Sequence, residues 1–233
     1  MVGVTSGSYE ANGMWVVKVN NRGDVIWNKT FSDLIGWQII SSRYGGYVII
    51  AEKYVNTSKS DSSVCLIKID NNGYVEWNST YDFEGNDRPC SIIQLPDGGF
   101  LIVGSTRYLT ETSDVFLIKT DANGGVIWNK TYGGDKLDRA YDAIRAVDDG
   151  YMIVGETSSY GASDIDILLM KINEDGTLEW VKTYSSNKAD YVASLAISVA
   201  PSIIINNHVI SVTMDNTLFL VRLRIIYTYK NYH

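Results

Sequence analysis

The residues that could carry out acid–base, nucleophilic or metal chemistry are few in this chain. Its two histidines are His208 and His233, and its two cysteines are Cys65 and Cys90. Two histidines cannot supply the ligand cluster of a zinc site, and neither a nucleophile-elbow motif nor a glycine-rich phosphate-binding motif occurs. We expect buried thiols, because a disulfide between the cysteines would need Cα atoms within about 7 Å. The sequence therefore predicts no catalytic residue, no metal site and no cofactor.

Four Asn-x-Ser/Thr sequons could accept an N-linked glycan. Three of them, at Asn28, Asn78 and Asn129, occupy one position of an internal repeat, on a segment that would be accessible only at an exposed sheet edge. The fourth, at Asn56, lies in a predicted loop. Asn56 is therefore the candidate that we expect to be accessible for glycosylation.

Charge and hydropathy exclude several classes of partner. The formal net charge is −7 and the pI is about 4.8, which argues against nucleic acid and against an anionic membrane surface. No stretch of about 20 apolar residues could span a bilayer. The first residues have neither a basic region nor an apolar core typical of a signal peptide. We expect an extracellular or cell-surface location if upstream sequence is missing, and a cytoplasmic one otherwise.

A short segment recurs four times along the chain. Its tryptophans follow one another at intervals of 50, 51 and 52 residues, and a lysine stands nine residues before each. Between them, Asn or Asp opens a turn and Gly closes it, which is typical of a hairpin between antiparallel strands. We expect the tryptophans to pack between repeats, and each lysine to form an exposed ion pair at its turn, for example with Asp70 or Asp121. The pairs are Lys18 with Trp27, Lys68 with Trp77, Lys119 with Trp128 and Lys171 with Trp180.

Each full repeat contains four strand-like segments. In the repeat that ends at Tyr184 they are AYDAIRAV, GYMIVGET, DILLMKI and TLEWVKTY. Short apolar runs bounded by turns predict strands, and four strands at a period of about 50 residues are typical of a β-propeller blade. The sequence thus predicts an all-β fold of four-stranded antiparallel sheets. The approximate repeats are 1–31, 32–81, 82–132, 133–184 and 185–233.

The stretch KTDANGGVIWNKTYGGDKLDRAYDAIRAVDDGYMIVGETSSYGASDIDILLMKI resembles a family of repeat β-propellers common in surface and secreted proteins of archaea and bacteria. Its turn-to-tryptophan part is similar to the tryptophan-docking repeat of quinoprotein-type propellers, in which the indole wedges between blades. The resemblance implies a single propeller domain over 1–233, with about five blades. Gly3 aligns with Gly104 and Gly155, so the first blade is expected to lack its first strand.

The resemblance implies a non-enzymatic scaffold that binds a protein or a glycan at the cell surface. A site would lie at one mouth of the central channel, where the first strands of the blades converge. By position in the repeat, the candidate binding residues are Trp37, Arg88, Asp138, Tyr141 and Tyr191.

Two alternatives remain open. One is a propeller-fold enzyme, such as a glycosidase, lyase or quinone-dependent oxidoreductase, because a fold alone does not determine function. A location of His208 outside the channel would count against it. The other is a structural segment of a larger surface protein.

Overall fold

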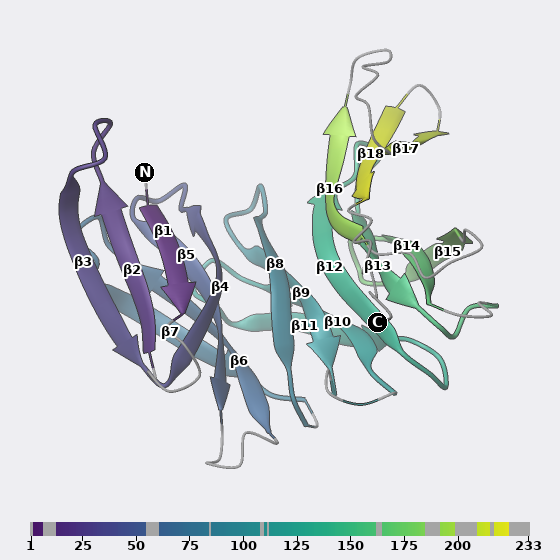
Figure 1. The fold of residues 1–233 in the computed structure, drawn as a ribbon, viewed down its shortest axis with the longest axis horizontal. Helices are drawn as coiled ribbons and strands as arrows, with labels where there is room; N and C mark the ends of the chain where they lie inside the picture. The colour runs from purple at the N-terminus through teal and green to yellow at the C-terminus, as the bar shows by residue number, and fades with distance from the viewer. Residues whose placement is uncertain are drawn as a thin grey trace, which may run out of the picture. The chain divides into compact units, whose positions relative to one another are not determined.

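The computed structural model describes residues 2–6, 13–54, 61–83, 85–107, 110, 112–161, 165–184, 192–198, 209–214 and 217–223. Within these ranges the only regular elements are strands, all paired antiparallel in sheets of three or four strands (Figure 1). The prediction of an all-β fold built from four-stranded antiparallel sheets is therefore confirmed. The chain divides into two compact units, Met1–Ala140 and Tyr141–His233.

The sheets follow the order of the chain. The first holds β1 (Val2–Ser6), β2 (Gly13–Val19) and β3 (Val25–Ser32). The second holds β4 (Leu34–Ser41), β5 (Tyr47–Tyr54), β6 (Ser62–Ile69) and β7 (Val75–Tyr81), and the third holds β8 (Arg88–Gln94), β9 (Phe100–Thr106), β10 (Asp114–Thr120) and β11 (Val126–Tyr132). The fourth holds β12 (Asp138–Arg145), β13 (Tyr151–Thr157), β14 (Asp166–Ile172) and β15 (Leu178–Tyr184). In these four sheets each strand pairs with its neighbour in sequence.

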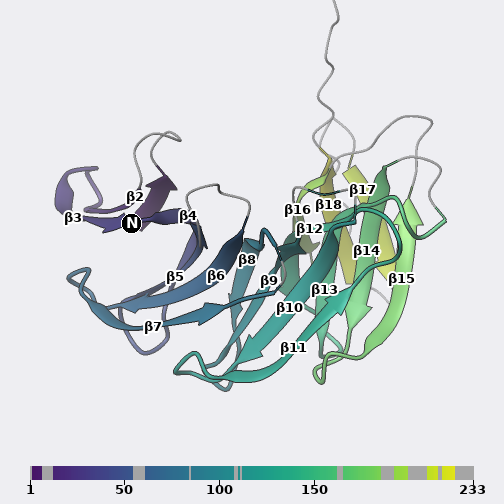
Figure 2. The ribbon, with the colours of Figure 1, turned by 90° about the horizontal axis from the view of Figure 1, so that it is seen from below.

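The last sheet departs from that order. It consists of β16 (Val192–Ser198), β17 (Val209–Met214) and β18 (Thr217–Leu223), and β18 lies between the other two (Figure 2). In the four-stranded sheets the first strand pairs with the second instead. The sequence after Arg222 lacks the turn-and-tryptophan segment of the other repeats. In this sheet β16 occupies the edge of β18 that the fourth strand occupies beside the third strand in the four-stranded sheets.

The nine-residue offset between lysine and tryptophan is explained by strand register. In all four copies the lysine and the tryptophan are direct cross-strand partners, and the register shifts immediately after the lysine. Such a shift marks a β-bulge, which adds one residue to one strand and increases the local twist. The offset is therefore the length of one hairpin with a bulge at its base.

The hairpin turns are fixed by their own side chains. Oδ1 of Asp70 accepts hydrogen bonds from the backbone N–H groups of Asn72 and Tyr74, at 2.8 and 2.9 Å. These N–H groups lower the pKa of the Asp70 carboxyl, the Tyr74 N–H having the largest effect. The turn closes at Gly73, whose φ of 80° favours glycine. The turn that opens at Asp121 is built in the same way.

The two inner strands of the second sheet, β5 and β6, are buried on both faces, which accounts for their nearly continuous apolar sequences. Along β5, Ile49 and Ala51 pack into one cluster with Met14 and Val16 of β2. The alternate residues Val48 and Ile50 pack on the opposite face with Phe100 and other residues of the third sheet. Because successive side chains of a strand point to opposite faces, a strand covered on both sides needs apolar residues on both of its faces.

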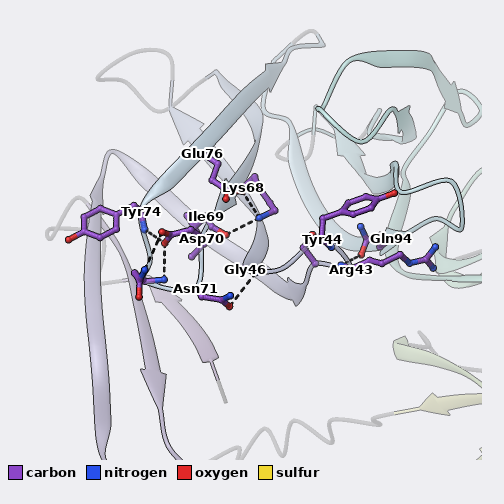
Figure 3. Close-up of polar contacts among 12 residues, drawn as sticks. Arg43, Tyr44, Gly46, Lys68, Ile69, Asp70, Asn71, Tyr74, Glu76 and Gln94 are labelled. Carbon is purple, nitrogen blue, oxygen red and sulfur yellow. Dashed lines mark hydrogen bonds and ion pairs between the residues drawn. The ribbon is translucent and has the colours of Figure 1, made fainter.

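Trp27 joins the first sheet to the second. Its indole Nε1–H donates to the backbone carbonyl of Asn71, at 2.9 Å, in the turn between β6 and β7. A Cβ added to Gly73 of that turn would lie 3.0 Å from the Trp27 ring, so the indole is seated on the glycine. The Asn71 side chain in turn accepts the N–H of Gly46, at 3.3 Å (Figure 3).

Trp77 repeats this arrangement between the second and third sheets. A Cβ on Gly124 would come within 2.9 Å of its ring, and the Tyr81 hydroxyl donates to the Gly124 carbonyl at 2.8 Å. Trp77 also packs against the cluster that contains Phe100. The prediction that these tryptophans pack between repeats is thus confirmed for Trp27 and Trp77. Gly23, at the equivalent turn of the first sheet, is exposed and has nothing within 4 Å of where a Cβ would lie.

The expectation of exposed lysine ion pairs is wrong for Lys68. This side chain is buried, and its ammonium group lies 2.6 Å from a carboxylate oxygen of Glu76 and 3.1 Å from the Ile69 carbonyl (Figure 3). Asp70, the partner we had expected, uses its carboxylate to hold the turn. Burial between sheets requires the ammonium to be paired and hydrogen-bonded, and Glu76 on the adjacent strand supplies that pairing.

The other lysines find different partners. Lys171 is buried, pairs with Asp148 and donates to the Asp149 carbonyl at 2.6 Å. Lys18 donates to the Asn71 carbonyl at 3.0 Å, the same oxygen that accepts the indole N–H. Lys18 and Lys171 thus use acceptors that a nearby turn supplies.

Replacing Trp27 with Phe should lower the free energy of unfolding by about 1–2 kcal/mol. The ring is kept, but the hydrogen bond to the Asn71 carbonyl is lost together with part of the contact on Gly73. Urea unfolding followed by circular dichroism measures the change. Trp15→Phe is the matched control, because Trp15 is 44% exposed and should change stability by less than about 0.5 kcal/mol. Equal effects of the two substitutions would contradict this role for Trp27.

Candidate functional site

Two of the predicted binding residues meet where the second and third sheets adjoin. Trp37 comes from β4 and Arg88 from β8, the first strands of these sheets, which are neighbours. The guanidinium carbon of Arg88 lies 4.0 Å from the centroid of the Trp37 ring. This is a close cation–π contact, and both residues are half-buried.

A β-bulge places the Trp37 side chain. The register of β4 against β5 shifts between Gly36 and Gln38, which leaves Trp37 as the extra residue. The register of β8 against β9 shifts in the same way around Cys90. Bulges re-aim side chains and are common at functional positions. The same repeat position therefore carries a large aromatic side chain in one sheet and a thiol in the next.

Glu52 completes this group. The Trp37 indole donates to its Oε2 at 3.3 Å, and the residue is 6% exposed. Burial raises the pKa of the Glu52 carboxyl, while hydrogen bonds from Ser62 and Trp37 and the positive charge of Arg88 act in the opposite direction. We call Trp37, Glu52 and Arg88 the Trp37 cluster. It presents an aromatic ring and a cation, oriented by a buried acid.

The remaining predicted residues lie elsewhere. Asp138 is fully buried, and its Oδ2 accepts the N–H of Gly134 at 2.8 Å, which fastens the loop before β12. Tyr141 is half-buried in the second unit, against the cluster of Met152 and Val154. Tyr191 and Asn56 lie outside the described residues, as do His208 and His233.

Asp87 is a buried acid that the sequence reasoning missed. Its Oδ2 accepts the N–H of Phe83 at 2.5 Å, and among the described residues Oδ1 has no hydrogen-bond partner. Burial raises its pKa to about 6; the Phe83 N–H and the Thr106 hydroxyl oppose this effect, and the nearby acids Asp82 and Asp61 add to it. A signal was available, because Asp87 stands six residues before Ile93 just as Asp138 stands six before Ile144.

The two cysteines do not form a disulfide, and each has contacts of its own. The Cys65 Sγ lies 3.6 Å from the Thr80 hydroxyl, and burial raises the pKa of the thiol. The Cys90 Sγ donates to the Val103 carbonyl at 3.3 Å. Neither contact provides a base that would activate a thiolate.

Polar contacts link the turn between β4 and β5 in the second sheet to residues of the third sheet. In the turn between β4 and β5, the Arg43 N–H donates to Gln94 Oε1 at 2.8 Å and its guanidinium donates to the Pro96 carbonyl at 2.6 Å. The neighbouring Tyr44 ring covers Gly98. These groups satisfy one another, so this side of the unit is held by structure rather than arranged around a ligand.

The described ranges contain neither a metal-ligand cluster nor a membrane-spanning helix. No group of three or more His, Cys, Asp or Glu side chains there could hold a metal ion. No helix there is long and apolar enough to cross a membrane.

Comparison of the sequence with protein-family models gave no match, and comparison with curated proteins gave none.

Replacing Asp87 with Asn should flatten the pH dependence of stability. A carboxyl whose pKa is raised from 3.8 to about 6 on folding contributes stability below about pH 4, and that contribution is lost as the pH rises through 6. Between pH 4 and 7 the wild-type chain should therefore lose about 2–3 kcal/mol relative to Asp87→Asn. Urea unfolding across this range measures the difference.

Asp135→Asn serves as the control for that experiment, since Asp135 is an exposed acid in the loop before β12. Its curve of unfolding free energy against pH should run parallel to that of the wild type. A parallel curve for Asp87→Asn as well would show that Asp87 does not carry the effect.

Proposed function

We propose that the chain forms a β-propeller of about five four-stranded blades, and that it acts as a non-enzymatic scaffold binding a protein or a glycan at the cell surface. The observation that carries the propeller is the repeated seating of an indole on a glycine turn of the following sheet, at Gly73 and Gly124. A sheet that is buried on both faces needs a similar sheet on each side, and a radial arrangement supplies one.

The binding role rests on the Trp37 cluster. In a propeller, the first strands of the blades surround the central channel, which is the place that β4 and β8 would take. Trp and Arg are the residue types most enriched at binding hot spots, because a rigid ring and a planar cation offer large contact areas at low entropic cost. The ring of Trp37 could pack on the apolar face of a sugar or on a side chain, while Arg88 donates hydrogen bonds.

Glu52 acts on the ligand through Trp37. Its carboxylate accepts the indole N–H and attracts the guanidinium of Arg88. Both groups are therefore held before a ligand arrives, which reduces the entropy lost on binding.

Screening the chain on glycan and peptide arrays tests this function, with titration calorimetry on the hits. Trp37→Ala and Arg88→Gln should each weaken binding about 10-fold or more, equivalent to at least 1.4 kcal/mol. Trp15→Ala removes an exposed indole from a different sheet and should leave the affinity unchanged.

Circular dichroism of each variant separates lost binding from lost folding. Arg88→Gln is the more informative variant, because Trp37 also packs against the core cluster of the second and third sheets. Unchanged affinity in both variants would contradict the assignment of the Trp37 cluster. Turnover of a glycan hit into products would support the enzymatic alternative.

A further inference from the structure

The last strands of the first three sheets are edge strands that carry repeated asparagines. β3, β7 and β11 are each paired on one side only within their sheets. Asn28, Asn78 and Asn129 lie on these strands and are exposed. We call these three residues the outer asparagine column. A sheet edge of this kind is the condition under which the three sequons would be accessible.

The alternation of the strand turns each sequon outward. In β3 the burial pattern alternates from Ile26 onward, so that Asn28 and Thr30 are exposed while Trp27 and Lys29 are half-buried. β7 and β11 show the same alternation, with Thr80 and Thr131 exposed. Because residues i and i+2 lie on one face of a strand, the asparagine and the threonine of each sequon share one face of the strand, and both are exposed. The docked tryptophan occupies the other side.

We propose that the outer asparagine column is a set of N-glycosylation sites. This inference rests on the cell-surface location in the proposed function, since the transferases that recognise sequons act on exported chains. In the transfer, the asparagine amide nitrogen bonds to the anomeric carbon of a lipid-linked, phosphate-activated oligosaccharide. The bond from that carbon to the phosphate oxygen breaks, the phosphate leaves with the electron pair, and the amide nitrogen releases one proton to solvent.

A glycan fits these positions without disturbing the core. Each asparagine is exposed and lies on the strand face opposite the tryptophan of its own strand, so that indole does not have to move. The same strands begin with pairs of exposed apolar residues, and an apolar edge with unpaired backbone groups is prone to association with other chains. A bulky, solvated glycan beside each pair would oppose that association. The pairs are Val25 with Ile26, Tyr74 with Val75 and Val126 with Ile127.

The fourth sheet provides an internal comparison. At the equivalent position of β15, Val181 replaces the asparagine, while Lys182 and Thr183 follow as in the first and third copies. This strand therefore has the threonine but lacks the acceptor. A single substitution, Val181→Asn, would complete the sequon there.

Glycopeptide mass spectrometry of the secreted full-length chain tests the inference. The chain is expressed behind a secretion leader in a eukaryotic host, with a flexible sequon appended after His233. Only molecules whose appended sequon carries a glycan are scored, so every scored molecule has met the transferase. We expect glycans at Asn28, Asn78 and Asn129. Thr30→Ala should abolish the glycan at Asn28 alone, and Val181→Asn should add one site.

Unmodified asparagines at all three positions of the scored molecules would overturn the inference. So would persistence of the Asn28 glycan in Thr30→Ala. The binding arrays are read independently of this result. A chain that is glycosylated along the column but binds nothing would support this inference and contradict the proposed function. A chain that binds a ligand while the column stays unmodified would support the proposed function and contradict this inference.

Discussion

The seating of an indole on a glycine turn is the contact on which the rest of the first unit depends. Trp27 reaches Gly73 and the Asn71 carbonyl of the next sheet, and Trp77 reaches Gly124 of the sheet after that. This contact requires a glycine with positive φ at the turn, because a side chain there would collide with the ring. It also requires the turn to be rigid, which the hydrogen bonds of the turn-opening Asp70 and Asp121 provide. The recurring turn-and-tryptophan sequence therefore encodes this one contact between adjacent sheets, which we call the intersheet joint.

That joint brings the first strands of neighbouring sheets together, and so creates the environment of the Trp37 cluster. Stacking two apolar sheets desolvates any polar residue between them, and a buried acid needs partners to offset the loss of water. Glu52 finds them in Trp37, Ser62 and the charge of Arg88. Asp87 is less well supplied, since one oxygen has no partner within the described ranges and burial keeps its pKa high. The stacking of the sheets thus determines both the packing of this unit and the environment of its buried acids.

Much of the fold was predictable from the sequence, because each strand and turn is encoded locally and repeated. The hairpin between Lys68 and Trp77, for example, follows from the turn residues alone. The partners of the lysines were not predictable, because Lys68 selects Glu76 over Asp70 only once the sheets have stacked. Glu52 was missed for the same reason: nothing in its sequence neighbourhood indicates that Trp37 and Arg88 converge on it. The pairing of β16 with β18 departs from the strand order of the four-stranded sheets, and sequence periodicity does not indicate it.

The intersheet joint also has a direction. Each of the first two sheets donates an indole to the sheet that follows, so donor and acceptor surfaces differ and the contact is head-to-tail. Contacts of this kind either close into a ring or continue without limit. Within the part of the chain that the structure describes, the turn at Gly23 is an acceptor with no indole on it, and its glycine is exposed where Gly73 and Gly124 are buried. The Gly23 turn is thus an acceptor for an indole, of the same kind as the turns at Gly73 and Gly124. Because the contact is head-to-tail, only a surface that presents an indole, as the first two sheets do, could occupy it.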